Sequence, residues 1–240
     1  VSGYIQDIFV IRTNSIGDTL WTKTFGVQGG SAQTSSKIYE TDDNGFIIGG
    51  YHNPGTGAHA YILKLDSHGN LIWQKYYNFN IAANLGGIKQ TFDKGYIITG
   101  ETSSGGKNIF LSKLDAIGNI EWVKYYQNGT NLPQKGFDLI QLPDSGYIVA
   151  SAVNRNYASP FTVDCWILRT NAIGDTLWTK FYPNFWPHCI NTTINNGYVI
   201  TGHDKTSNGI GVLYKLDNKC DTIWTRKYDV FPSCNLYEVH

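Results

Sequence analysis

The chain is poor in charge and has no long apolar run. Only 16% of its 240 residues are charged, the formal net charge is zero, and Lys and Arg form no cluster. Because nucleic-acid binding usually needs a basic face, we expect no nucleic-acid partner. No stretch approaches the roughly 18 apolar residues typical of a transmembrane helix. We therefore expect no direct insertion into a membrane.

Methionine is absent, cysteine is scarce, and no signal peptide is recognisable. A sequence that begins at Val1 and has neither a methionine nor a signal peptide indicates a processed chain or a fragment of a longer one. The cysteines allow three complete pairings, and none lies in a Cys-x-x-Cys zinc or redox motif: Cys165, Cys189, Cys220 and Cys234. Cys189 and Cys234 follow a Pro-x pair in consecutive repeats, so we predict a disulfide between them.

Signatures of chemistry are also missing. The sequence contains no Gly-x-Ser-x-Gly, His-Glu-x-x-His or P-loop motif. His188 beside Cys189 supplies two of the three or four ligands that a metal site needs. We therefore predict no metal and no cofactor.

Glycine and aromatic residues are plentiful instead. The chain has 26 Gly, 16 Tyr and 7 Trp. Tyr and Trp favour strands, and Gly favours tight turns. No segment shows an apolar period of 3.6 residues over a useful length, so helices are not expected. The composition indicates an all-β chain.

Two segments recur along the whole sequence. The first appears five times, as IRTNSIGDTLWTK, LKLDSHGNLIWQK, SKLDAIGNIEWVK, LRTNAIGDTLWTK and YKLDNKCDTIWTR. The second appears four times, as DNGFIIGG, DKGYIITG, DSGYIVAS and NNGYVITG, with leading glycines Gly45, Gly95, Gly146 and Gly197. The repeat length is therefore about fifty residues, and we predict one domain over residues 1–240.

Each segment is typical of a β-hairpin. In the first, Asp or Asn opens a tight turn whose fourth position is Gly, as in Asp66 to Gly69. This pattern predicts a type I turn followed by a glycine bulge between antiparallel strands. Cys220 replaces that glycine in the fifth repeat, where a positive φ would be unfavourable. The second segment is Asp/Asn-x-Gly followed by an aromatic and β-branched residues, which predicts another hairpin.

Four short antiparallel strands per repeat make one blade of a β-propeller, and neighbouring blades stack face to face. The repeated tryptophans are predicted to anchor adjacent blades, although a row of ligand-stacking aromatics is the alternative: Trp21, Trp73, Trp122, Trp178 and Trp224. A Lys or Arg follows two positions after each Trp, and we interpret these cations as solvated rim residues. A functional ring of charge is the alternative.

The two ends of the sequence suggest how such a ring could close. Val1-Ser2-Gly3 aligns with the end of a second strand, and CNLYEVH resembles a first strand. We predict five blades, closed by N- and C-terminal strands that share one blade. A five-repeat fragment of a six- to eight-bladed propeller is the alternative.

The pattern GYIITG…DIFL-K-LD-x-x-GN-x-x-W resembles the β-propeller repeats of bacterial secreted and surface proteins. It looks most like those of Bacteroidetes, which are often cargo of the type IX secretion system. The resemblance covers nearly the whole chain. It implies a propeller fold and an extracellular or cell-surface location, in proteins where such repeats serve as adhesive, scaffolding or binding modules.

Parts of the chain that break the repeat are the places to look for a binding site. They are the connections at residues 51–57, 154–162 and 183–188. Alternation of antiparallel strands places these connections on one face of a propeller, so Tyr51, Tyr157 and Trp186 are predicted to line a shared ligand-binding face by aromatic stacking. Ordinary loop packing is the competing interpretation.

Three functional hypotheses follow. The leading one is a non-enzymatic extracellular scaffold or protein-interaction module, whose partner is a protein or glycan at the cell surface. The second is a lectin that gains affinity through several similar grooves between blades. The third is a glycosidase-type hydrolase. It is disfavoured because most acidic residues lie in repeat turns, where Asp stabilises the turn itself, as at Asp42, Asp43, Asp93 and Asp144.

Overall fold

A computed structural model describes residues 7–26, 32–53, 58–77, 79, 83–102, 108–129, 132–154, 163–204 and 210–228. Within these ranges the chain is all-β, with 18 strands and no helix. Accordingly, no helix in the described part is long and apolar enough to cross a membrane. The prediction of an all-β chain is confirmed.

The strands form four four-stranded antiparallel sheets and one two-stranded sheet. The two-stranded sheet contains β1 (Ile8–Thr13) and β2 (Thr19–Phe25). Next come β3 (Ala32–Glu40), β4 (Phe46–Asn53), β5 (His59–Leu65) and β6 (Leu71–Tyr77), then β7 (Ala83–Gln90), β8 (Tyr96–Thr102), β9 (Ile109–Leu114) and β10 (Ile120–Tyr126). The last two sheets are β11 (Gln134–Gln141), β12 (Tyr147–Asn154), β13 (Val163–Thr170) and β14 (Thr176–Tyr182), then β15 (Phe185–Thr192), β16 (Tyr198–Asp204), β17 (Gly211–Leu216) and β18 (Thr222–Tyr228).

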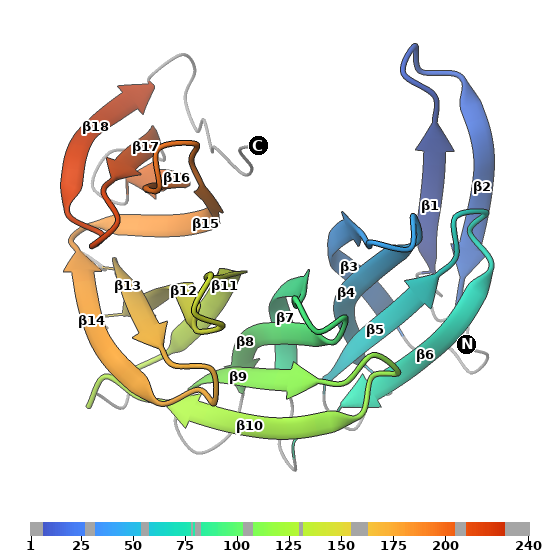
Figure 1. The fold of residues 1–240 in the computed structure, drawn as a ribbon, viewed down its shortest axis with the longest axis horizontal. Coiled ribbons are helices and arrows are strands. Elements are labelled where there is room, and N and C mark those ends of the chain that lie inside the picture. The colour runs from blue at the N-terminus through green and yellow to red at the C-terminus, as the bar shows by residue number, and fades with distance from the viewer. Residues whose placement is uncertain are drawn as a thin grey trace, which may run out of the picture.

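The five sheets stand side by side around an arc, with β7 and β11 on its inner side and β10 and β14 on its outer side (Figure 1). This arrangement is propeller-like, and each four-stranded sheet follows the predicted strand order along the chain. The arc is open between β15–β18 and β1–β2 (Figure 1). Residues 1–3 and 234–240, which carry the predicted closing strands, lie outside the described residues.

The hairpin between the last two strands of each sheet has the predicted turn. Gly69 N donates to Asp66 O at 3.1 Å, Asp66 N donates to Asn70 O at 2.9 Å, and Gly69 has a φ of 75°. The Asp66 carboxylate also accepts from two backbone amides of the turn. Cys220 takes the glycine position in the last sheet and has the unfavourable positive φ of 59°. The sequence prediction for this turn is confirmed.

The hairpin between the first two strands needs its glycine for another reason. Its positive φ belongs to the residue before the glycine, for example Asn44 at 58° and Lys94 at 69°. A Cβ at Gly45 or Gly95 would lie 2.3 Å from a carbonyl oxygen of the third strand. Glycine is therefore required here by close backbone approach and not by a left-handed conformation.

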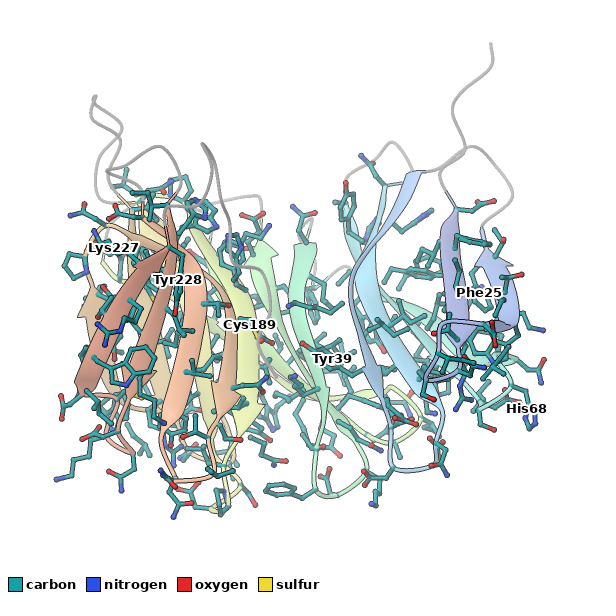
Figure 2. All side chains as sticks on the ribbon, turned by 90° about the horizontal axis from the view of Figure 1, so that it is seen from above. Phe25, Tyr39, His68, Cys189, Lys227 and Tyr228 are labelled. Carbon is teal, nitrogen blue, oxygen red and sulfur yellow. The ribbon has the colours of Figure 1, made fainter. Side chains whose placement is uncertain are left out.

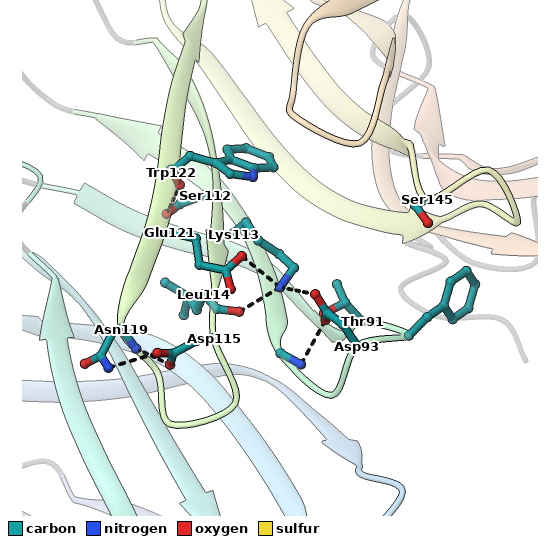
Figure 3. Close-up of polar contacts among 12 residues, drawn as sticks. Thr91, Asp93, Ser112, Lys113, Leu114, Asp115, Asn119, Glu121, Trp122 and Ser145 are labelled. Atoms are coloured by element: carbon teal, nitrogen blue, oxygen red, sulfur yellow. Dashed lines mark hydrogen bonds and ion pairs between the residues drawn. The ribbon is translucent and has the colours of Figure 1, made fainter.

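A buried cation ties this hairpin to the third strand (Figure 3). Lys113 Nζ, whose side chain is 5% exposed, lies 2.8 Å from Asp93 Oδ2 and donates to Leu114 O at 3.0 Å. Burial raises the pKa of Asp93, but hydrogen bonds from Lys113, Thr91 and the Gly95 amide outweigh it and lower the pKa to about 2. Lys64 and Asp43 make the same 2.8 Å ion pair in the preceding sheet. Arg169 and Asp144 pair likewise in the following one.

Neighbouring sheets are joined by a contact that we call the blade joint. In it the outer-strand tryptophan covers the turn glycine of the next sheet, so that a Cβ at Gly118 would meet Trp73 at 3.0 Å. Trp73 also packs edge-on against Tyr96 at 5.7 Å between ring centroids. Trp21 packs on Phe46 and Gly69, and Trp122 packs on Tyr147 and Gly174, in the same manner.

Two polar contacts complete the blade joint. Tyr77 Oη donates to Gly118 O at 2.8 Å, and Tyr126 Oη donates to Gly174 O at 2.6 Å. The cation two positions after each Trp was expected to be a solvated rim residue. Lys75 is instead half-buried and donates to Asn119 of the next sheet at 2.7 Å. Lys23, Lys124 and Lys180 contact Asn70, Asp175 and Asp221 in the same way, so four of the five cations bridge neighbouring sheets.

Candidate functional site

Comparison of the sheets with one another separates structural positions from variable ones. The blade joint and the turn ion pair recur, whereas one cross-strand position near the end of the first two strands differs among the four four-stranded sheets. Its pairs are Thr34 with Tyr51, Asn84 with Glu101, Lys135 with Ala152, and Trp186 with His203. Since the scaffold does not require a fixed residue type there, this end of the sheets is free to carry a binding site.

The largest departure is a group of rings that we call the Trp186 cluster: Phe137, Trp186, His188 and His203. Trp186 packs edge-on against Phe137 at 5.3 Å and lies nearly parallel to His203 at 6.1 Å. His188 Nε2 and His203 Nδ1 are 2.8 Å apart, a hydrogen-bond distance that requires one nitrogen to donate and the other to accept. His188 also contacts Phe137 edge-on at 6.1 Å.

The cluster is assembled by two β-bulges. The pairing of β11 with β12 shifts between Gly136 and Asp138, and that of β15 with β16 shifts between Pro187 and Cys189. The extra residues at these shifts are Phe137 and His188. The same shift occurs between Ser35 and Lys37 and between Leu85 and Gly87, so the bulge recurs in all four four-stranded sheets and re-aims the side chain of its extra residue. The two bulges bring rings from neighbouring sheets into contact.

Charged side chains lie beside the cluster. Lys135 Nζ is 5.2 Å from the centre of the Phe137 ring and 3.7 Å from Glu101 Oε1. Asp204, 6% exposed, follows His203 and is 2.5 Å from Lys227 Nζ. Aromatic, imidazole, ammonium and carboxylate groups therefore share one end of β11, β15 and β16, a mixture suited to recognition of a polar and aromatic ligand.

Asp138 follows the bulge at Phe137 and is fully buried. Its Oδ2 accepts from the Ile190 amide of the next sheet at 3.1 Å, and its Oδ1 has no hydrogen-bond partner among the residues that the structure describes. Burial raises the pKa of Asp138, against smaller lowering effects of Lys89 and Lys37. The hydrogen bond from Ile190 ties β11 to β15 next to the Trp186 cluster.

A pocket lies on the outer side of the molecule, between β10 and the β13–β14 hairpin. It measures about 500 Å³ and is lined by aromatic residues together with Gln127, Asn128 and threonines. We call it the outer groove. Trp166 and Phe181 lie in it as parallel rings, 5.9 Å apart with 6° between their planes. Tyr125 contributes from the neighbouring sheet and is 44% exposed.

The predicted ligand-binding residues are placed as follows. Trp186, which was predicted in a connection, lies on β15 and is half-buried. Tyr51 lies on β4, also half-buried, in a sheet separated from that of Trp186 by β7–β10 and β11–β14. Tyr157 lies outside the described residues. A face shared by these three residues stays a prediction.

The structure also shows where three of the cysteines lie and how possible metal ligands are distributed. Cys165, Cys189 and Cys220 are all buried, and the predicted partner Cys234 is not among the described residues. In the described ranges, no group of three or more His, Cys, Asp and Glu is placed to hold a metal ion.

Sequence reasoning missed Phe137, His188 and His203. The bulge recurs in every four-stranded sheet, and only the last two of these sheets carry aromatic or imidazole side chains at its extra residue, Phe137 and His188. A signal was nevertheless available, because His203 occupies the repeat position of Tyr51 and Glu101, where the residue type changes from sheet to sheet. No protein-family model matches the chain, and a search of curated proteins gives no significant match.

Proposed function

We propose that the chain is a five-bladed β-propeller that acts outside the cell, or on its surface, as a non-enzymatic protein-interaction module. The location rests on the resemblance of the repeats to those of secreted and surface proteins. The five repeats and the arc of sheets support the blade number.

The Trp186 cluster is the observation that carries the binding proposal. Tryptophan is among the residues that dominate binding energy at protein interfaces. Here Trp186 is half-buried, held by Phe137 and His203, and near the Lys135–Glu101 pair. A partner peptide with an aromatic or apolar anchor and flanking charges fits this chemistry.

Selection from a random peptide display library against the purified chain tests the proposal. Selected peptides should bind Trp186→Ala at least about 30-fold more weakly, the effect of an interface residue worth roughly 2 kcal/mol. The matched control is Phe92→Ala, because Phe92 is 63% exposed and lies in a turn between β7 and β8, away from the cluster. Peptides that bind Trp186→Ala as tightly as the parent chain would refute the cluster as the site.

A glycan-binding function is the second candidate, favoured by the outer groove. Sugars bind proteins by stacking on aromatic faces and by hydrogen bonds to amides and hydroxyls, and both kinds of group line this groove. Facing aromatic pairs recur at the same register in three sheets: Tyr61 with Tyr76, Phe110 with Tyr125, and Trp166 with Phe181. Similar grooves would add affinity through multivalency.

A glycan array run at several protein concentrations tests this candidate. Saturable binding to one sugar class that is lost in Phe181→Ala and kept in Trp186→Ala would favour the lectin over the peptide-binding module. Phe181 is 44% exposed, so its substitution should leave the core intact. An array without saturable binding would remove the lectin hypothesis and leave the peptide selection to decide.

A further inference from the structure

The first and last sheets of the arc each carry one side of a blade joint: the first sheet carries a turn, and the last sheet carries an outer strand with the Trp. Four of the five sheets present a turn to the preceding sheet, and that turn is covered by a Trp, a Tyr or Phe and a Lys of the preceding outer strand. The residues on the turn side are Gly69 and Asn70, Gly118 and Asn119, Gly174 and Asp175, and Cys220 and Asp221. Among the described residues, the β1–β2 turn and the outer strand β18 are the two halves without a partner half.

On β18 the three joint residues point to solvent. Trp224 is 39% exposed and Tyr228 is 40% exposed, whereas Tyr77 at the equivalent position of β6 is 5% exposed. Arg226, which takes the place of Lys75, is also exposed. Figure 2 shows Tyr228 and Phe25 on opposite sides of the open part of the arc. In β6 and β10, the residues at these positions cover the turn of the next sheet.

The β1–β2 turn is the matching half. Its hydrogen bonds are those of the other turns, with Gly17 N donating to Asn14 O at 3.2 Å and Asn14 N donating to Asp18 O at 2.9 Å. Gly17 has a φ of 92°, and no atom of the described residues lies within 4 Å of the place that a Cβ would occupy. At Gly69 the same space is filled by Trp21 at 2.9 Å.

The strand behind this turn also exposes an apolar face. Phe9 is 59% exposed and Ile11 is 54% exposed, while their repeat equivalents on β5, Tyr61 and Leu63, are buried at 1% and 0%. The buried equivalents pack against the preceding sheet, beside Ile8 and Val10 of β1. Within the described part of the chain, no preceding sheet covers this face of the first sheet.

The two halves fit each other residue by residue. Trp224 would cover Gly17, as Trp73 covers Gly118. Tyr228 Oη would donate to Gly17 O, as Tyr126 Oη does to Gly174 O. Arg226 would face Asp18, the position that Asp175 takes opposite Lys124 at 3.0 Å. Charge, size and hydrogen-bonding roles all match.

We propose that β18 docks on the β1–β2 turn of the same chain and forms a fifth blade joint. Both halves belong to one molecule and lie at the two ends of a curved row of sheets (Figure 1). Because the contact would be intramolecular, its stability should not depend on protein concentration, unlike a contact with a second copy. The joint would bury Trp224 and the apolar face of β1 together.

A charge-reversal cycle tests this joint. The variants are Asp18→Lys, Arg226→Asp and the double variant, compared by thermal unfolding at low ionic strength. Each single variant should lower Tm by up to about 4 °C, and the double variant should regain most of that loss. Lys124→Asp with Asp175→Lys is the positive control, because this pair is joined in the structure.

A second measurement does not depend on ion pairing. If β18 is docked, Trp224→Ala should lower Tm as much as Trp122→Ala, whose side chain is half-buried in a formed joint. Light scattering during size exclusion gives the mass of each variant. Regained stability in a monomer together with a damaging Trp224→Ala supports the proposal.

Two results would overturn it. A Trp224→Ala variant as stable as the parent chain, with no coupling between positions 18 and 226, would show that β18 does not dock. Coupling that appears only in a dimer, with a Tm that rises with protein concentration, would make a second copy the occupant of the joint.

Discussion

Loss of a single hydroxyl at a blade joint should be measurable. Tyr126 is 8% exposed, and its Oη donates to Gly174 O at 2.6 Å across the boundary between two sheets. Tyr126→Phe removes the donor and leaves a buried carbonyl without that partner. Such a change costs about 1–3 kcal/mol. For a chain of 240 residues this corresponds to a fall in Tm of about 2–4 °C for each kcal/mol.

Guanidinium unfolding followed by Trp fluorescence measures this change. The midpoint should fall while the m-value stays the same, because the surface exposed on unfolding is unchanged. Tyr125→Phe is the matched control: Tyr125 is 44% exposed, and its Oη lies 3.3 Å from Phe79 O. Its stability should change by less than about 0.5 kcal/mol.

The reverse substitution is available at the first joint, where Phe25 takes the position of Tyr126. Phe25→Tyr adds a donor for Gly69 O and should stabilise the chain by about 0.5–1.5 kcal/mol. A Tyr126→Phe variant no less stable than Tyr125→Phe would refute the role assigned to this hydroxyl.

Three further substitutions have defined outcomes. Because the pKa of Asp93 is lowered to about 2, its ion pair stabilises the fold at pH values above the ordinary pKa of 3.8, and this stability is lost as pH falls towards 2. Asp93→Asn should reduce the free energy of unfolding at pH 7 and make it less dependent on pH in the acid range, as measured by urea titrations. Burial raises the pKa of Asp138, so the stability that its protonated carboxyl provides is present at low pH and is lost as pH rises through the raised pKa. Asp138→Asn should therefore stabilise the chain at pH 7 and weaken the fall of stability with rising pH. An unchanged pH profile of stability would contradict this. Cys220→Gly removes a non-glycine residue from a φ of 59° and should raise stability by up to about 1 kcal/mol in chemical unfolding, whereas a clear loss would show that the buried thiol contributes more than the strain costs.

Much of the architecture could be predicted because it repeats. The turn at Asp66 to Gly69, the positive φ at Cys220 and the order of strands within each sheet depend on local sequence, and the structure shows all of them. The buried Lys113 was not predicted, since a single Lys in a strand gives no sign that it faces an Asp across the sheet. Its recurrence at Lys64 and Arg169 was the available signal.

The candidate site could be predicted only in part. Trp186 was identified because it breaks the repeat, but Phe137 and His188 reach it through bulges that shift the pairing of β11 and β15. Bulge positions depend on how two strands pair and not on either strand alone. The half-buried Lys75 was interpreted as a rim residue because its partner, Asn119, lies in another repeat.

The central claim is that repeated positions hold the sheets together and that divergent positions at one end bind a partner. Parallel measurement of Tm and peptide affinity for Trp122→Ala and Trp186→Ala tests this claim most directly. We predict that Trp122→Ala lowers Tm by far the larger amount, as expected for truncation of an inter-sheet Trp worth about 3–5 kcal/mol when buried. Trp186→Ala should keep most of the stability and lose affinity for the selected peptides. A Trp186→Ala variant that is as destabilised as Trp122→Ala and still binds would contradict the claim.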